Sequence, residues 1–332
     1  MSGETTGGYI PSKEENGNAH QNRIRNSSAQ RVVGNIPEAE KKQILRDMGE
    51  RFNDQTFEDL KDKEREKRSE ELQIIGLANE VTNEVRRKYG LEDIDIPSDN
   101  IHVIDQEAWP PEEKGRAFHN SMFQAVLLRE EQAKTVFLET VFHEMIHFKS
   151  YNALQVSSGE NPELDEYRLG LIIHTRDGKE KNFTNLNEAV TEEVTKRYVP
   201  KLFNNPIFAE ELEQTRLVRD RNQKAVTSSG EPLFDDDTFY AQEKLAHIET
   251  EGFSYQLERK NLNLLIDKIF KRNIDKFQDR EEVFEVFAKG MLTGNILPVG
   301  RLIETTFGKG TLRHIGELDD NIQAQEEFIS FL

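Results

Sequence analysis

The sequence predicts an α+β protein that is mostly helical, with a small sheet packed on one central helix and a helical C-terminal half. Long stretches place apolar residues at helical intervals, a few short runs are typical of strands, and a strong hairpin signal separates two of those runs. With 35% hydrophobic and 32% charged residues in 332, the composition is lean for a globular protein. Part of the length is therefore expected to be solvated tail or exposed helix, while the remainder can still bury a sizeable core.

The N-terminal part of the chain divides in two. Residues 1–36 are rich in Gly, Ser, Asn, Gln and Glu, which predicts a disordered tail. Pro37 then opens a long charged helical segment, residues 37–90, with an interruption near Asn53. The charged run at residues 61–68 indicates a solvated helical face or, alternatively, a partner-binding arm.

Residues 91–332 predict one further domain, whose C-terminal part is helical from about residue 186. The elements expected before that part are two β-type runs, one helix and a hairpin: 101–104, 122–129, 133–149, and 167–175 with 182–184. Asp177–Gly178, between the last two runs, is a strong hairpin signal. We therefore expect a small sheet before and after the helix at 133–149.

The C-terminal part is helical apart from an acidic, turn-rich interval at 220–238. Two apolar stripes at helical spacing are expected in the core: Leu262, Leu265, Ile266, Ile269 and Phe270, and Val283, Phe284, Phe287 and Met291. No internal repeat is evident.

Composition excludes several classes of protein and site. The chain has no cysteine, so disulfides, thiolate metal sites and cysteine nucleophiles are excluded. A net charge of −18 argues against nucleic acid as a partner. The first residues have neither a basic nor an apolar region of a signal peptide, and no apolar run approaches 18 residues. We expect a soluble cytoplasmic protein that binds no membrane.

An HExxH sequence in the helix at 133–149 carries the strongest functional information. His143 and His147 are four residues apart, so both imidazoles lie on one face of the helix and can reach one metal ion, for which zinc is the natural candidate. Glu144 stands beside that ion without being a ligand, where its carboxylate can take a proton from a zinc-activated water. The alternative is a pair of structural histidines in a chain that contains 8 His.

A catalytic zinc needs a third protein ligand, and the helix predicted from residue 186 offers two carboxylates. Glu188 and Glu192 are four apart and point the same way. If Glu188 binds the ion, Glu192 is placed one turn onward to accept the second N–H of an imidazole. The reverse assignment, with Glu192 as the ligand, and ordinary surface charge are the alternatives.

HExxH followed by Asn-Glu-x-x-x-(Asp/Glu) resembles the gluzincin zinc metallopeptidases, as an uncharacterised subgroup. The resemblance implies a zincin-like fold, with His143, His147 and Glu188 as zinc ligands, Glu144 as general base and Glu192 as the carboxylate beside an imidazole. Forty residues separate His147 from Glu188, about twice the usual interval, and the predicted hairpin fills the difference. The resemblance covers about 50 to 60 residues and specifies no substrate.

The implied reaction is zinc-assisted hydrolysis of peptide bonds in a peptide or protein substrate. An extended peptide could pair with the run at 122–129 if that strand lies at a sheet edge. Tyr240 and His247 are weak candidates for stabilising the oxyanion, provided that residues 239–248 are helical. The alternative function is a non-catalytic zincin-like domain that binds zinc or a partner; retention of Glu144 and the lack of an evident fourth ligand favour the enzyme.

Overall fold

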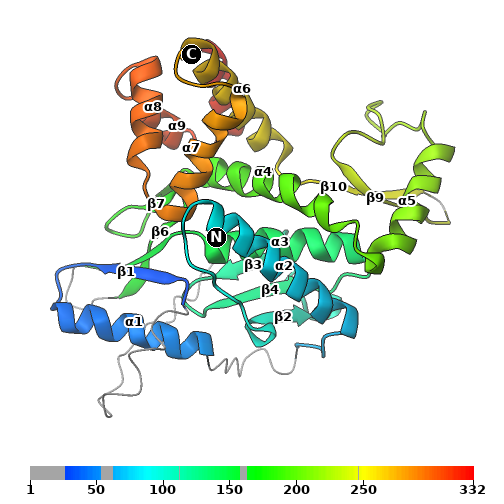
Figure 1. The fold of residues 1–332 in the computed structure, drawn as a ribbon, viewed down its shortest axis with the longest axis horizontal. Coiled ribbons are helices and arrows are strands. Elements are labelled where there is room, and N and C mark those ends of the chain that lie inside the picture. The colour runs from blue at the N-terminus through cyan, green and yellow to red at the C-terminus, as the bar shows by residue number, and fades with distance from the viewer. Residues whose placement is uncertain (1–26, 54–62, 112, 158–162, 246) are drawn as a thin grey trace.

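The structure is a computed structural model that describes residues 27–53, 63–111, 113–157, 163–245 and 247–332. It has the predicted α+β class and is dominated by helices (Figure 1). The helices are α1 (Glu38–Asn53), α2 (Ser69–Lys88), α3 (Lys134–Lys149), α4 (Thr184–Leu202), α5 (Ala209–Arg221), α6 (Gln256–Arg272), α7 (Arg280–Thr293), α8 (Leu297–Phe307), α9 (Thr311–Glu317) and α10 (Ile322–Phe331).

The described strands form three small sheets. One has the order β1-β5-β6-β7-β8, one the order β2-β4-β3, and β9 pairs with β10 in a hairpin. β1 with β5 and β2 with β4 are parallel, and the other neighbours are antiparallel. The strands are β1 (Ala29–Val33), β2 (Ile101–Ile104), β3 (Ala117–Asn120), β4 (Ala125–Arg129), β5 (Asn152–Val156), β6 (Leu164–Leu169), β7 (Ile172–His174), β8 (Lys181–Asn182), β9 (Thr238–Glu243) and β10 (Ile248–Gly252).

Helix α3 lies at the centre of the molecule and matches the helix predicted at 133–149. It is apolar on most sides, so other elements must cover it all round. α2 and α4 pack against it, and the sheet of β2, β4 and β3 lies against it from below in the view of Figure 1. This packing makes α3 and α4 neighbours, which brings the two segments with candidate ligands together.

The C-terminal helices α6 to α10 form a layer above α4 (Figure 1). Both apolar stripes predicted there lie in the core, except that Phe270 is only partly buried. Asp319, between α9 and α10, accepts hydrogen bonds from the backbone N–H groups of Thr184 and Asn185. These bonds satisfy free donors of the first turn of α4, so the end of the chain fixes the start of this helix.

The sheet next to α3 corrects one prediction. The run at 101–104 is strand β2, as expected, but the run at 122–129 forms a strand only from Ala125. That strand, β4, is central in its sheet and cannot accept a peptide at an edge. The edge strand nearer α3 is β3, residues 117–120. This segment is short and follows a polar stretch, so the sequence predicted a loop there.

The predicted hairpin around Asp177–Gly178 is present between β7 and β8. The run at 167–175, however, is split into β6 and β7 at Gly170, whose φ is 57°. A Cβ at that position would lie 2.4 Å from the side chain of Asn187, so glycine allows the turn to approach α4 closely.

Two N-terminal predictions are modified. Residues 29–33 lie in the segment expected to be disordered but form β1, which pairs with β5; residues 1–26 lie outside the described residues. The charged run at 61–68 was expected to be helical. Its residues 63–68 are instead non-helical, with a bridge between Glu64 and Ile104, and residues 61 and 62 lie outside the described part.

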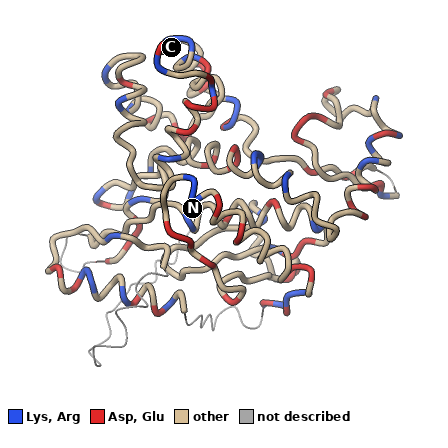
Figure 2. Tube along the Cα trace, viewed as in Figure 1, with Lys and Arg blue, Asp and Glu red and all other residues tan. Residues whose placement is uncertain are grey.

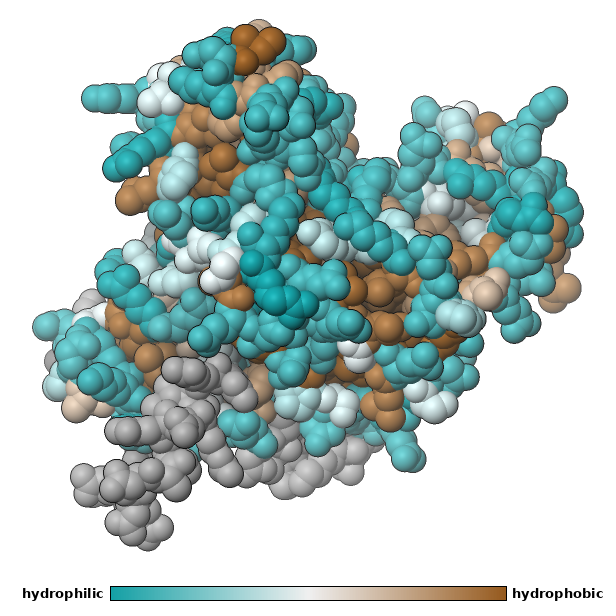
Figure 3. Space-filling view, viewed as in Figure 1, coloured by the Kyte–Doolittle hydropathy of each residue, from teal (hydrophilic) through white to brown (hydrophobic). Residues whose placement is uncertain are grey.

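Acidic and basic residues are interspersed along the chain (Figure 2), and hydrophilic side chains cover most of the face seen in Figure 3. Among the described residues, no helix is both long and apolar enough to cross a membrane.

Candidate metal centre

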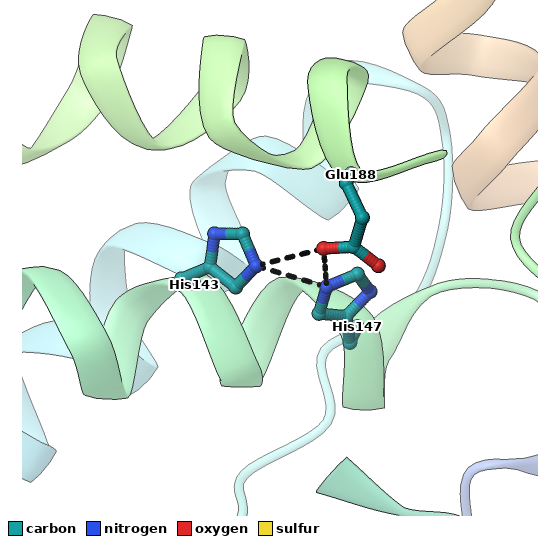
Figure 4. Close-up of side chains that lie close together, drawn as sticks. All are labelled: His143, His147 and Glu188. Atoms are coloured by element: carbon teal, nitrogen blue, oxygen red, sulfur yellow. Dashed lines mark hydrogen bonds and ion pairs between the residues drawn. The ribbon is translucent and has the colours of Figure 1, made fainter. Parts of the chain in front are cut away.

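Three side chains converge on one point between α3 and α4 (Figure 4). The Nε2 atoms of His143 and His147 are 3.0 Å apart. The Oε2 atom of Glu188 lies 3.3 Å from the first and 3.1 Å from the second. The histidines are buried and Glu188 is half-buried, so the three donor atoms face a common space that is largely shielded from solvent.

The separations fit a tetrahedral metal ion. Ligand atoms about 2.0–2.1 Å from zinc are roughly 3.3–3.4 Å from one another in a tetrahedron. The three measured separations lie close to this value or slightly below it, so an ion would need only a small outward shift of the side chains. Two neutral imidazoles and a carboxylate are also a donor set that zinc accepts. These residues could therefore hold a metal ion.

Each imidazole has a second polar neighbour at Nδ1. His143 Nδ1 lies 2.7 Å from Glu192 Oε2, and the Asn187 amide lies 3.3 Å from His147 Nδ1. The Asn187 Oδ1 in turn accepts the backbone N–H of Leu171 at 2.9 Å. The Glu192 carboxylate can accept Nδ1–H, which holds the His143 ring with Nε2 toward the metal position. Glu192 is thus placed as the sequence predicted. Asn187 presents its amide N–H group to His147 Nδ1, so it packs against this ring but does not favour the tautomer with a free Nε2.

The electrostatic environment favours a protonated His143 and an ionised Glu188 in the metal-free cluster. Burial opposes the charged form of His143, but hydrogen bonds to Glu188 and Glu192 outweigh it and raise the pKa of this imidazole. Burial likewise opposes ionisation of Glu188, yet the two histidines hold its pKa well below the usual range. Glu188 is therefore a carboxylate over the ordinary pH range, as a metal ligand must be.

Glu144 lies beside this cluster on α3 and is buried. Burial raises the pKa of its carboxyl group, while the nearby His143 and His147 and a hydrogen bond from the backbone N–H of His119 lower it; the net shift is upward. A raised pKa makes a carboxylate a stronger base at neutral pH. Glu144 therefore has both the position and the basicity of a general base.

Glu139 extends the cluster one turn toward the start of α3. Its carboxyl oxygen, a nitrogen of His143 and a carboxylate oxygen of Glu192 lie within 4.8 Å of one another. Burial and the charge of Glu192 raise the pKa of Glu139 far above its ordinary value. A protonated Glu139 hydrogen-bonds to Glu192, which makes this group a chain of hydrogen bonds behind His143. Glu139 was not predicted, because it precedes the HExxH motif.

The two candidates for the oxyanion are not where the sequence placed them. Residues 239–243 belong to β9 and Ile248 begins β10, so the described residues of this segment are not helical. Tyr240 is buried in β9, hydrogen-bonds to Gln242, and burial raises its pKa to about 12. His247 is exposed at the hairpin turn. Tyr240 and His247 are seven residues apart and would share a face only in a helix. Because the segment is not helical, the prediction that both lie at the site is wrong.

Tyr255, which the sequence analysis did not consider, lies at the cluster instead. Its ring stacks on His143, with centroids 5.5 Å apart and planes at 13°. Burial together with the nearby carboxylates of Glu188 and Glu144 raises the pKa of its hydroxyl group, so it keeps its proton. Ser254 N–H donates to Glu192 Oε1 at 2.7 Å, which ties the Tyr255 turn, with φ of 54° at this residue, to the cluster.

No protein-family model, curated protein or solved structure matches this chain. The site therefore rests on the geometry described above.

Proposed function

We propose that this protein is a zinc metallopeptidase of the gluzincin type, which hydrolyses peptide bonds. The observation that carries the proposal is the convergence of His143, His147 and Glu188 on one point, with Glu144 and Tyr255 at its border. Only three protein ligands are grouped there among the described residues, which is typical of catalytic rather than structural zinc.

Zinc bound at this point would polarise the scissile carbonyl group and activate the attacking water. Glu144 takes the proton from that water and passes it to the nitrogen of the leaving amine. Tyr255, which retains its proton, donates a hydrogen bond to the oxygen that becomes negative during attack. Glu192 accepts the Nδ1–H of His143 and keeps this imidazole oriented toward the metal position.

The edge of β3 is suited to bind the peptide. Arg129 N–H donates to Arg116 carbonyl oxygen at 2.7 Å, so residues 116, 118 and 120 direct their backbone groups to β4. Ala117 and His119 then direct theirs away from the sheet, and the His119 N–H reaches Glu144. A substrate strand paired along this edge would bring its backbone next to the general base.

Metal content tests the ligand assignment. The purified wild type is expected to hold one zinc per chain, whereas Glu188→Ala lowers the occupancy and loses the stabilisation that zinc gives. That stabilisation is about 2.7 kcal/mol at a free zinc concentration 100 times the Kd. Occupancy is measured by elemental analysis and stability by thermal unfolding with and without zinc. Unchanged zinc content in Glu188→Ala would remove this ligand.

Hydrolysis tests the chemistry. Glu144→Gln is expected to keep zinc and lose about 10²- to 10⁴-fold in kcat on a diverse peptide library. Tyr255→Phe is expected to lower kcat by about 10²- to 10³-fold, with little change in KM. Tyr240→Phe is the matched control, because this tyrosine hydrogen-bonds to Gln242 outside the cluster, and should retain wild-type kcat.

Equal, metal-independent cleavage by wild type and Glu144→Gln would refute the peptidase proposal. The protein would then be a zinc-binding or partner-binding domain without turnover. A similar loss in Tyr240→Phe and Tyr255→Phe would refute the role of Tyr255 alone.

A further inference from the structure

His119 has a side chain that the proposed chemistry does not use. It lies on β3 and its ring meets Phe148 of α3 edge-on, with centroids 5.0 Å apart. Consecutive residues of a helix face different directions, but the charge of His147 also acts on this imidazole, so the ring lies near the metal cluster. Both ring nitrogens are shielded from solvent and have no hydrogen-bond partner among the described residues.

An imidazole in such a place remains neutral and needs partners. Burial, with a smaller effect of His147, lowers the pKa of His119 to about 3. A neutral ring offers one N–H donor and one acceptor nitrogen. Leaving a buried donor or acceptor unpaired is destabilising, because the group loses its hydration without gaining a partner. The ring is therefore poised to pair with a polar group that enters beside it.

The backbone of the same residue indicates where that group comes from. The backbone N–H of His119 lies near enough to Glu144 to lower the pKa of that carboxyl group, so this residue lies near the general base of the proposed function. A peptide along β3 places a residue adjacent to the cleaved bond opposite His119. A charged side chain would have to give up its hydration there, whereas a neutral polar one exchanges water for the imidazole.

We infer that His119 is a specificity-determining residue that selects an uncharged hydrogen-bonding side chain, that of Ser, Thr, Asn or Gln, next to the cleaved bond. This inference rests on the proposed peptidase function. It assigns the β3 imidazole a role in substrate choice that is separate from holding zinc, moving protons or stabilising the oxyanion.

The kinetic test uses the zinc-loaded protein and peptides that differ only at the two residues flanking the cleaved bond. Wild type is expected to favour the Thr peptide over the Val peptide by at least about tenfold in kcat/KM, which corresponds to about 1.4 kcal/mol. His119→Phe keeps a ring but no nitrogen and should reduce this preference to less than about twofold. His119→Asn keeps a donor and an acceptor and should retain part of it.

His174→Phe is the matched control, since this histidine lies on β7 of a different sheet and pairs with Glu166 at 3.7 Å. It should keep the wild-type preference. If His119→Phe fails to fold, the Thr-to-Val ratio of the wild type and of His119→Asn still decides the matter. A wild type without polar preference, or His119 variants that retain it in full, would overturn the inference.

A binding measurement gives a second readout that needs no turnover. Trp109 is the single tryptophan of the chain and packs against Phe118 of β3, with ring centroids 5.9 Å apart. Its fluorescence should therefore report a peptide added to this strand. In a Glu144→Gln background, His119→Phe is expected to raise the Kd of the Thr peptide at least tenfold, with unchanged zinc content. An unchanged Kd overturns the inference.

The two proposals fail in different ways. If wild type cleaves peptides but His119 variants keep the same preference, only the role of His119 is wrong. If no peptide is cleaved and none changes the Trp109 signal, the peptidase function falls and the role of His119 falls with it.

Discussion

Helix α3, which carries the two histidines, and helix α5, which forms a lateral arm with β9 and β10, differ sharply in burial. α3 buries 14 of its 16 residues, whereas α5 buries only Val218 of its 13. α5 lies beside the β9–β10 hairpin at the right of Figure 1 and its exposed face carries charge pairs, such as Arg216 with Glu213 and Asp220. The ligand geometry is thus held by packing from all sides, while the arm makes few buried contacts and can open locally at low cost.

The largest expected difference concerns packing. Phe142→Ala in α3 removes a fully buried ring and should lower the free energy of unfolding by about 3–5 kcal/mol. The matched change in α5, Leu217→Ala, affects a side chain that is 38% exposed and should cost less than about 0.5 kcal/mol. Urea unfolding with a chelator present measures both without a contribution from zinc. Similar costs would contradict the contrast between the helices.

The second difference concerns buried charge. Because burial and Glu192 raise the pKa of Glu139, the folded metal-free protein keeps a proton that the unfolded chain loses above the ordinary glutamate pKa. The free energy of unfolding should therefore fall as pH rises above about 4.5, because above this pH the unfolded chain releases a proton that the folded protein retains. Glu139→Gln mimics the protonated acid and should reduce this slope, making the variant more stable than wild type at pH 8 relative to pH 4.5.

Unfolding of the metal-free protein at these two pH values measures the effect. Glu213→Gln in the arm is the control, since Glu213 is exposed, and should leave the slope unchanged. A slope as steep in Glu139→Gln as in wild type would mean that Glu139 ionises in the folded protein, since the raised pKa of His143 contributes to the slope in both.

The smallest effect is expected for surface pairs of the arm. Arg216→Ala breaks contacts of 2.7 Å to Glu213 and 2.9 Å to Asp220, but all three side chains are more than half exposed. Solvent screening should keep the loss below about 0.5 kcal/mol. Thermal unfolding in low and high salt measures it. A larger, salt-independent loss would show that the arm depends on these charges more than its exposure indicates.

The parts of the molecule that could be read from the sequence are those encoded over a few residues. The four-residue spacing of His143 and His147, and of Glu188 and Glu192, determines a shared helical face wherever those helices lie. The apolar stripes of α6 and α7 were predictable for the same reason. The strand β3 was not, because four residues with a mixed pattern become a strand only by pairing with β4.

Tyr240 and Tyr255 show where local patterns stop being informative. Both follow the ligand segments, and spacing alone favoured Tyr240 because it assumed a helix. Tyr255 reaches His143 because Ser254, 62 residues from Glu192 in the sequence, donates its N–H to that carboxylate. A contact between residues this far apart in the sequence depends on how α4, β10 and α6 pack. It cannot be predicted from the spacing of residues within one helix or strand.

The sequence by itself determined the pair of histidines, the adjacent base and the two glutamates, because helix geometry converts spacing into direction. Only the tertiary structure decided which further groups join them: Asn187 and Glu139 behind the imidazoles, Tyr255 above His143, and His119 at the edge of β3. The physical reason is that orientation within a helix is a local property, whereas burial, pKa and contact between distant segments arise only when the elements pack.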